Sequence, residues 1–144
     1  MRIYTIGFTK KSAKKFFEIL KANDIAQIVD VRLNNTSQLA GFAKRDDLKY
    51  FLNELCGIDY HHFTFLAPTK DIRDRYNKEG DWDRYIDEYT RLLEKRKVLD
   101  ILDRSFFETD TCLLCSESSA DHCHRRLLAE YLKKYWKGVE VVHL

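Results

Sequence analysis

The sequence lacks a long hydrophobic run and an excess of one charge. No apolar stretch approaches the roughly 20 residues that a helix needs to cross a bilayer, and Met1-Arg2-Ile3 leads into a strand-like segment rather than a signal peptide. We therefore expect a cytoplasmic protein that does not use a membrane. The 25 Lys and Arg residues nearly balance the 23 Asp and Glu residues, and the formal net charge is +2. Because the charges balance, the protein as a whole has no strong positive potential that would attract nucleic acid or an acidic partner. Only local basic patches could attract them.

Cysteine and proline are scarce as well. Four cysteines in a chain of 144 residues are too few for a disulfide framework, so we interpret them as core thiols or as site residues. The chain has one proline, and it contains no internal repeat, low-complexity tract or interdomain linker. Its 44% hydrophobic and 13% aromatic residues suffice for a hydrophobic core and exclude disorder. We expect one domain that spans residues 1–144.

Short apolar segments alternate with amphipathic segments along the chain. The apolar segments predict strands at residues 2–8, 25–31, 59–66, 111–115 and 139–143. The amphipathic segments predict helices at residues 12–23, 48–55, 82–93, 98–102 and 121–136. The polar segment 33–47 and the charged segment 68–81 are expected to be loops, the second with a frayed helical turn at most. This alternation predicts a three-layer α/β fold, with a mostly parallel sheet of about five strands flanked by helices.

The residues that could carry chemistry cluster where the predicted strands end. Ligands of open α/β sheets bind outside the carboxyl ends of the strands. Gly7 ends the first strand, where it permits a turn and the close approach of a ligand. Arg32 follows the second strand, where it either binds an anion or pairs with Asp30. Cys115 ends the fourth strand, and Arg125 follows it. We expect four residues to bind a ligand: Gly7, Arg32, Cys115 and Arg125.

The segment after the fourth predicted strand combines thiols with the start of a helix. Ser118 or Asp121 is expected to cap this helix, which places Cys123, His124 and Arg125 in its first turn. Free N–H groups and the helix dipole favour an anion there. The thiol of Cys123 is therefore predicted to have a lowered pKa, unless it is a buried cysteine that only packs.

Three residues are candidates for catalysis. Glu117 is the candidate general acid or base, Cys123 is the candidate nucleophile, and His124 could tune that thiol. In the charged segment, Arg73 and Arg75 could act on a ligand from a lid. No role is assigned to three further histidines: His61, His62 and His143.

A metal site is not expected. Cys112 and Cys115 form a C-x-x-C pattern, but on a strand they face opposite sides of the sheet and do not chelate one ion together. Only Cys115, Cys123, a histidine and Glu117 could converge. We expect no metal and no cofactor.

Several motifs in this chain resemble the domain of unknown function 488 family. They are Thr5-Ile6-Gly7, Asp30-Val31-Arg32, the segment at Leu66, Trp82 with Tyr85, Cys115-Ser116-Glu117, Cys123-His124-Arg125 and Val142-His143. The pairing of C-x-E with C-H-R is the most specific element. The resemblance implies a compact α/β domain and no particular activity. Two places depart from the pattern of the family: Phe8-Thr9 replaces His or Asn followed by Ser, and Leu66-Ala67-Pro68 replaces L-G-G.

Three functions are compatible with these residues. The leading hypothesis is a cleft for an anionic, phosphate-bearing ligand, such as a nucleotide or a nucleic-acid end, held by Arg32, Arg125 and the helix start in an enzyme or a binding protein. The second is an enzyme of thiol or sulfur chemistry at Cys123 or Cys115. The third is a non-catalytic module, in which Cys115, Glu117 and Arg125 form a structural network. Thiol chemistry needs an accessible cysteine, whereas a structural network buries it, so the exposure of the thiols distinguishes the second function from the third.

Overall fold

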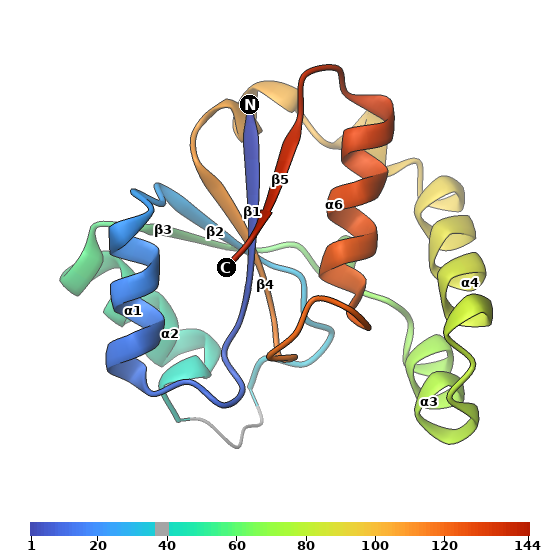
Figure 1. The fold of residues 1–144 in the computed structure, drawn as a ribbon, viewed down its shortest axis with the longest axis horizontal. Helices are drawn as coiled ribbons and strands as arrows, with labels where there is room; N and C mark the ends of the chain where they lie inside the picture. Colours follow the sequence, from blue (N-terminus) through green and yellow to red (C-terminus); the bar gives the residue numbers. More distant parts are fainter. Residues whose placement is uncertain (37–40) are drawn as a thin grey trace.

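One parallel sheet organises the chain (Figure 1). A computed structural model describes residues 1–36 and 41–144. The strands pair in parallel in the order β3-β2-β4-β1-β5. Their bounds are β1 (Arg2–Gly7), β2 (Gln27–Asp30), β3 (Asp59–His62), β4 (Thr111–Cys115) and β5 (Glu140–His143). The predicted parallel sheet of about five strands is confirmed.

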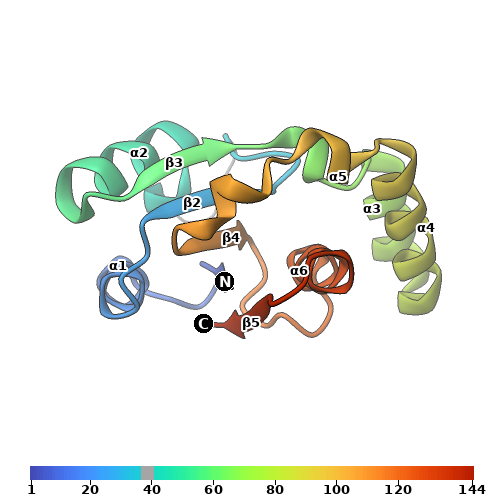
Figure 2. The ribbon, with the colours of Figure 1, turned by 90° about the horizontal axis from the view of Figure 1, so that it is seen from above.

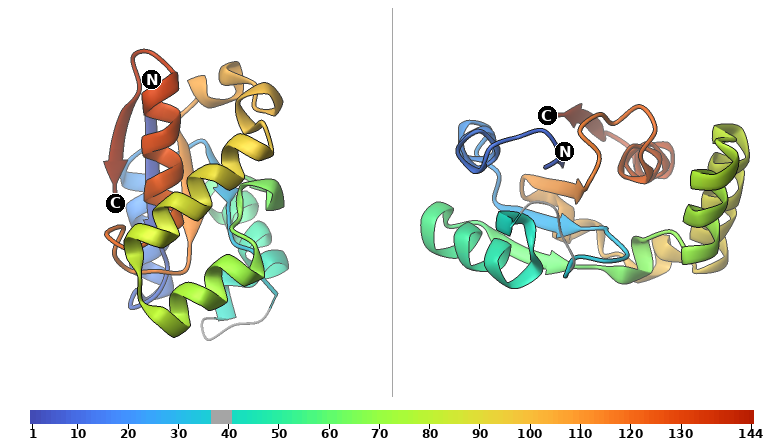
Figure 3. Two further views of the ribbon diagram at one scale, coloured as in Figure 1. Left: turned by 90° about the vertical axis from the view of Figure 1, so that its right-hand side faces the viewer. Right: turned by 90° about the horizontal axis from the view of Figure 1, so that it is seen from below.

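Helices cover both faces of this sheet. They are α1 (Ala13–Ala22), α2 (Arg45–Phe51), α3 (Lys70–Glu79), α4 (Trp82–Lys95), α5 (Val98–Ile101) and α6 (His124–Tyr135). Short helical turns lie at η1 (Gly41–Ala43), η2 (Leu52–Cys56), η3 (Thr64–Leu66) and η4 (Arg104–Glu108). Figures 1 and 2 show α1 and α2 on one side of the sheet and α6, α3 and α4 on the other. In Figure 3 the pair α3 and α4 lies beyond α6. No helix in the described ranges is long and apolar enough for a membrane span.

Two hydrophobic clusters explain why the strands are apolar along their whole length. The cluster under α1 and α2 includes Phe16, Leu48 and Cys112, and the cluster under α4 and α6 includes Tyr89 and Cys115. Successive residues of a strand point to opposite faces, and every residue of β4 is buried because both faces are covered. Cys112 and Cys115 thus lie on opposite faces, as strand alternation predicts.

The connections of two neighbouring strands diverge at the carboxyl edge. β1 leads into α1, on one face, while its neighbour β4 leads into α6, on the other. Such a point, where adjacent parallel strands connect to opposite faces, is where open α/β sheets hold their ligands. β2, the other neighbour of β4, also leads to the face of α1 through α2, so the fold places the candidate site at the carboxyl end of β4.

The charged segment 68–81 is a regular helix rather than a loop, so that prediction was wrong. Thr69 caps α3 by accepting a hydrogen bond from the Ile72 N–H at 3.2 Å. Gly80 ends the helix in the left-handed conformation, with φ of 70°. Only Ile72 of this helix is buried, so its hydrophobic pattern is weak. Capping residues and charge pairs mark α3 where apolar periodicity does not.

Other boundaries also moved. The predicted helix 121–136 begins at His124 with Cys123 as its N-cap, so neither Ser118 nor Asp121 caps it. The predicted strand 59–66 ends at His62 and continues as a helical turn. Within the predicted loop 33–47, residues 41–43 and 45–47 belong to η1 and α2, and residues 37–40 lie outside the described part.

Candidate functional site

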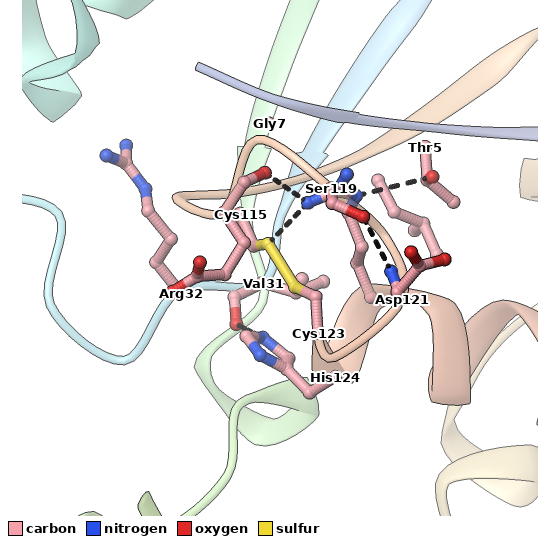
Figure 4. Close-up of a disulfide and its surroundings, with 12 residues drawn as sticks. Thr5, Gly7, Val31, Arg32, Cys115, Ser119, Asp121, Cys123 and His124 are labelled. Carbon is pink, nitrogen blue, oxygen red and sulfur yellow. Dashed lines mark hydrogen bonds between the residues drawn. A yellow bond between two sulfur atoms is a disulfide. The ribbon is translucent and has the colours of Figure 1, made fainter. Parts of the chain in front are cut away.

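The site is built on the loop that joins β4 to α6. The Thr9 N–H donates to the Ser116 carbonyl at 3.1 Å, which ties this loop to the end of β1. Near the other end of the loop, the Cys123 N–H donates to the Ala120 carbonyl at 3.3 Å. Between them, the Asp121 N–H donates to the Ser119 hydroxyl at 3.2 Å (Figure 4). One backbone bond therefore ties the loop to the chain that follows β1, and two bonds within the loop fix its path.

A buried arginine lies beneath this loop. Arg125 is 1% exposed, and its Nη1 donates to the Glu117 carbonyl at 2.6 Å and to Cys115 Sγ at 3.0 Å. Its Nε donates to the Thr5 hydroxyl at 3.3 Å. Within residues 1–36 and 41–144, no carboxylate forms an ion pair with it. The guanidinium therefore bridges β1, β4 and the loop without an ion-pair partner among the described residues, and the charge of Glu117 acts on it from a greater distance.

The loop backbone fills the space beside Gly7. A Cβ atom at this position would lie 1.5 Å from the Glu117 carbonyl oxygen and 2.9 Å from Arg125 Nη1. The sequence predicts a glycine that admits a close approach, and the group that approaches is the carbonyl of Glu117. Gly7 thus shapes the site by letting the loop and Arg125 pack against β1.

The two cysteines at the ends of the loop are joined. Figure 4 shows the disulfide between Cys115, the last residue of β4, and Cys123, the N-cap of α6. Each cysteine is 2% exposed. The sequence interpretation as core thiols or site residues did not include this bond. Cys112 remains a free thiol on the opposite face of the sheet, where burial raises its pKa.

Arg32 is paired with a carboxylate, which was one of its two expected roles. Its Nε and Nη2 donate to the two oxygens of Asp30 at 2.9 and 2.8 Å. Tyr60 and Asn35 donate to the same carboxylate. Burial alone would raise the pKa of Asp30, but the hydrogen bonds and charge of Arg32 outweigh it, so the pKa is lowered. In Figure 4 the Arg32 guanidinium points away from the disulfide.

His124 enters the site as a neutral imidazole. Its Nε2 lies 2.7 Å from the Val31 carbonyl, to which it donates. Burial lowers its pKa to about 4, against the ordinary value of 6.5, and the charge of Arg125 acts in the same direction. At neutral pH the ring is therefore an uncharged hydrogen-bond donor.

The three histidines to which no role was assigned contact their own surroundings. His61 packs edge-on against Phe106, with ring centroids 5.0 Å apart. His62 Nε2 lies 2.9 Å from the Arg32 carbonyl. His143 Nδ1 lies 2.6 Å from the Thr5 hydroxyl, and this hydroxyl also receives the bond from Arg125. Burial and the charge of Arg125 lower the pKa of His143.

A cleft of about 120 Å³ opens beside the disulfide. Its lining includes five predicted site residues: Arg32, Cys115, Glu117, Cys123 and His124. Gly7 and Arg125 do not line it. Arg73 lines it from α3, whereas Arg75 is turned to Glu88 in an ion pair of 3.0 Å. Sequence reasoning missed three polar or aromatic lining residues, Tyr76, Asn77 and Tyr85, on α3 and α4. The Thr69 and Gly80 caps of α3 were the signals that could have identified this wall.

The chemistry of the lining is mixed. Glu117 is exposed and offers a carboxylate, and Arg73 offers a cation. Tyr76 and Tyr85 have ring centroids 5.0 Å apart and form an aromatic wall. In the described residues, no group of three or more His, Cys, Asp or Glu side chains is arranged to hold a metal ion.

The family model described as "Domain of unknown function DUF488" matches residues 12–132. The chain belongs to this family. The DUF488 match contains the D-V-R, C-x-E and C-H-R motifs that surround the cleft, while Thr5-Ile6-Gly7 and Val142-His143 lie outside it. No match was found among the curated proteins or among the solved structures.

Replacement of Gly7 tests the close approach of the loop. In Gly7→Ala the new Cβ would lie 1.5 Å from the Glu117 carbonyl oxygen, so the loop has to move. We expect the free energy of unfolding, measured with urea, to fall by at least about 2 kcal/mol. Gly41→Ala is the matched control, because no atom of the described residues lies within 4 Å of the position that its Cβ would take. Equal stability of the two variants would contradict the packing described for Gly7.

The neutral state of His124 predicts a pH-dependent stability. Between pH 6.5 and about 4, the unfolded chain binds a proton at His124 that the folded chain does not bind. Stability is therefore lost as the pH falls through this window, by up to about 3 kcal/mol. His124→Gln retains a donor without this titration, so its urea midpoint is expected to change less between pH 7 and pH 4.5. An identical change in both proteins would show that His124 is not the group responsible.

Proposed function

We propose that the cleft beside Cys115 and Cys123 binds a small anionic ligand that carries a phosphate group, such as a nucleotide or a nucleic-acid end. The observation that carries this proposal is the buried guanidinium of Arg125, directly behind Cys115, without a carboxylate counter-ion in the described chain. A buried charge without a partner is costly. An anion in the adjacent cleft would supply the missing negative charge.

The positive potential around Arg125 supports the same proposal. The pKa values of Lys11, His124 and His143 are all lowered, first by burial and then by the charge of Arg125. These groups lie on three different segments around the ends of β1, β4 and β5. A potential that disfavours protonation of three neighbours favours an anion.

The start of α6 adds a second source of attraction. Its N-cap, Cys123, makes no side-chain hydrogen bond to the first turn. The N–H groups of that turn and the helix dipole therefore favour negative charge near the cleft. Arg32 contributes less, because Asp30 neutralises it.

The wall formed by α3 and α4 suits a nucleotide. Arg73 provides a cation that lines the cleft and is 41% exposed at its side chain, so it can contact a phosphate. Tyr76, which is half-buried, provides an aromatic ring for a base, and Asn77 provides an amide. If the ligand is also transformed, Glu117 is the proposed general acid or base, because it is the exposed carboxylate of the lining.

A structural module is the second candidate function. It is favoured by the bonds of Arg125 to Cys115 Sγ and to the Glu117 carbonyl, which form the polar network expected of such a module. In that case Arg125 serves the loop alone, and the cleft takes no ligand.

Calorimetric titration decides between these functions. Inorganic phosphate, AMP and a 5′-phosphorylated pentanucleotide are the three probes, and we expect AMP or the pentanucleotide to bind more tightly than phosphate alone. In Arg73→Gln the affinity for the tightest probe should fall about tenfold. Arg91→Gln is the matched control, because Arg91 is 75% exposed, pairs with Asp87 on α4 and does not line the cleft. Absence of binding by all three probes, or equal affinity in wild type and Arg73→Gln, would favour the structural module.

A further inference from the structure

The cysteine pair is placed to carry out chemistry of its own. We propose that Cys115 and Cys123 form a redox-active pair that exchanges with small thiols, in which Cys123 receives the incoming sulfur and Cys115 leaves as a thiolate beside Arg125. This proposal concerns thiol–disulfide exchange and does not depend on the proposed binding of an anionic ligand.

Both sulfurs belong to the wall of the cleft. Cys115 and Cys123 line it, although each residue is only 2% exposed. Burial of this degree is also what a structural network shows, so the exchange requires a thiol small enough to enter the cleft that both cysteines line. The other two cysteines do not share this position, because Cys112 lies on the opposite face and Cys56 lies at the end of η2.

Arg125 makes the two sulfurs unequal. Its Nη1 is 3.0 Å from Cys115 Sγ, so it can donate a charge-assisted hydrogen bond to this sulfur as a thiolate. Cys123 receives only the helix dipole, because it makes no cap bond to the N–H groups of α6. A direct hydrogen bond from a charged donor stabilises a thiolate more than the dipole of a helix terminus does. The guanidinium therefore outweighs the dipole, and Cys115 is the better-stabilised thiolate of the two.

The charge of Arg125, which has no ion-pair partner among the described residues, also favours a thiolate at Cys115. In the disulfide form no described carboxylate pairs with it, whereas reduction places a thiolate at 3.0 Å from Nη1. Reduction would thus provide a buried cation with its counter-ion. Among thiols, the one with the lower pKa is the better leaving group, so an external thiolate attacks the partner sulfur.

The exchange proceeds in two balanced steps. In the first, the sulfur of an incoming thiolate forms a bond with Cys123 Sγ, the Cys115–Cys123 bond breaks, and its electron pair leaves with Cys115 Sγ. In the second, another thiolate attacks the external sulfur of the mixed disulfide, a small disulfide forms, and Cys123 leaves as a thiolate. Two electrons pass from two external thiols to the protein, and the protons of those thiols go to solvent.

Mapping of the mixed disulfide tests the assignment of the two sulfurs. The full oxidised chain is treated with limiting glutathione, quenched with acid and digested for mass spectrometry. We expect glutathione on Cys123 and not on Cys115. The pair should also move between oxidised and reduced forms across a series of glutathione redox buffers. Glutathione on Cys115, or failure of the disulfide to form in any buffer, would overturn the proposal.

Alkylation of the reduced protein tests the role of Arg125. At pH 6.5 we expect iodoacetamide to label Cys115 at least tenfold faster than Cys56, whose pKa burial raises. In Arg125→Gln the rate at Cys115 should fall about tenfold, while that of Cys56 stays the same. If this variant does not fold, the comparison of Cys115 with Cys123 in the wild-type protein decides. Faster labelling of Cys123 would overturn the assignment of Cys115 as the thiolate.

Retention of phosphate binding separates this proposal from the previous one. A protein that binds AMP but shows no thiol exchange contradicts only the redox proposal. A protein that exchanges thiols but binds none of the three phosphate probes contradicts only the anion proposal.

Discussion

The buried guanidinium of Arg125 is the interaction on which the site depends. One side chain from α6 donates to a hydroxyl of β1, to a sulfur at the end of β4 and to the carbonyl of Glu117. These partners come from three segments far apart in the sequence, so the guanidinium fixes their relative positions. The absence of a Cβ at Gly7 is the steric condition for this arrangement, since both Arg125 and Glu117 occupy the space that a side chain would need. The hydrogen bonds of Arg125 and the close packing beside Gly7 thus depend on each other.

The same cation is available to two kinds of negative charge. A thiolate at Cys115 would accept a hydrogen bond from Nη1 directly. An anion in the cleft would be attracted by the positive potential of Arg125, which lies behind the cysteine pair. Electrostatics alone predicts that the two charges compete, because each weakens the attraction that the other feels. Asp30 removes Arg32 from this competition by a bidentate ion pair. The site therefore has one dominant buried positive charge rather than two.

The sequence was sufficient for the architecture, and insufficient for the contacts among the residues of the candidate site. Alternating apolar segments predict the parallel sheet because strands buried on both faces are apolar along their length. The apolar pattern did not predict helix α3, because only Ile72 of this helix is buried. The cleft residues Tyr76 and Asn77 were missed for the same reason. The disulfide could not be predicted either: Cys115 and Cys123 lie at a sequence separation of 8, and only the path of the loop brings the sulfurs together. The direction of the Arg125 side chain likewise depends on tertiary packing.

The strand order has a consequence for the assembly of the protein. β4 lies between β1 and β2, and each of these strands pairs with β4 rather than with the other. The first two strands of the chain therefore have no ladder in common, and the sheet stays divided until residues 111–115 insert. Pairing over such sequence separations is slow, because the entropy of loop closure is lost before the contacts form. On the ribosome, the cleft and its cysteine pair would exist only after most of the chain has been synthesised.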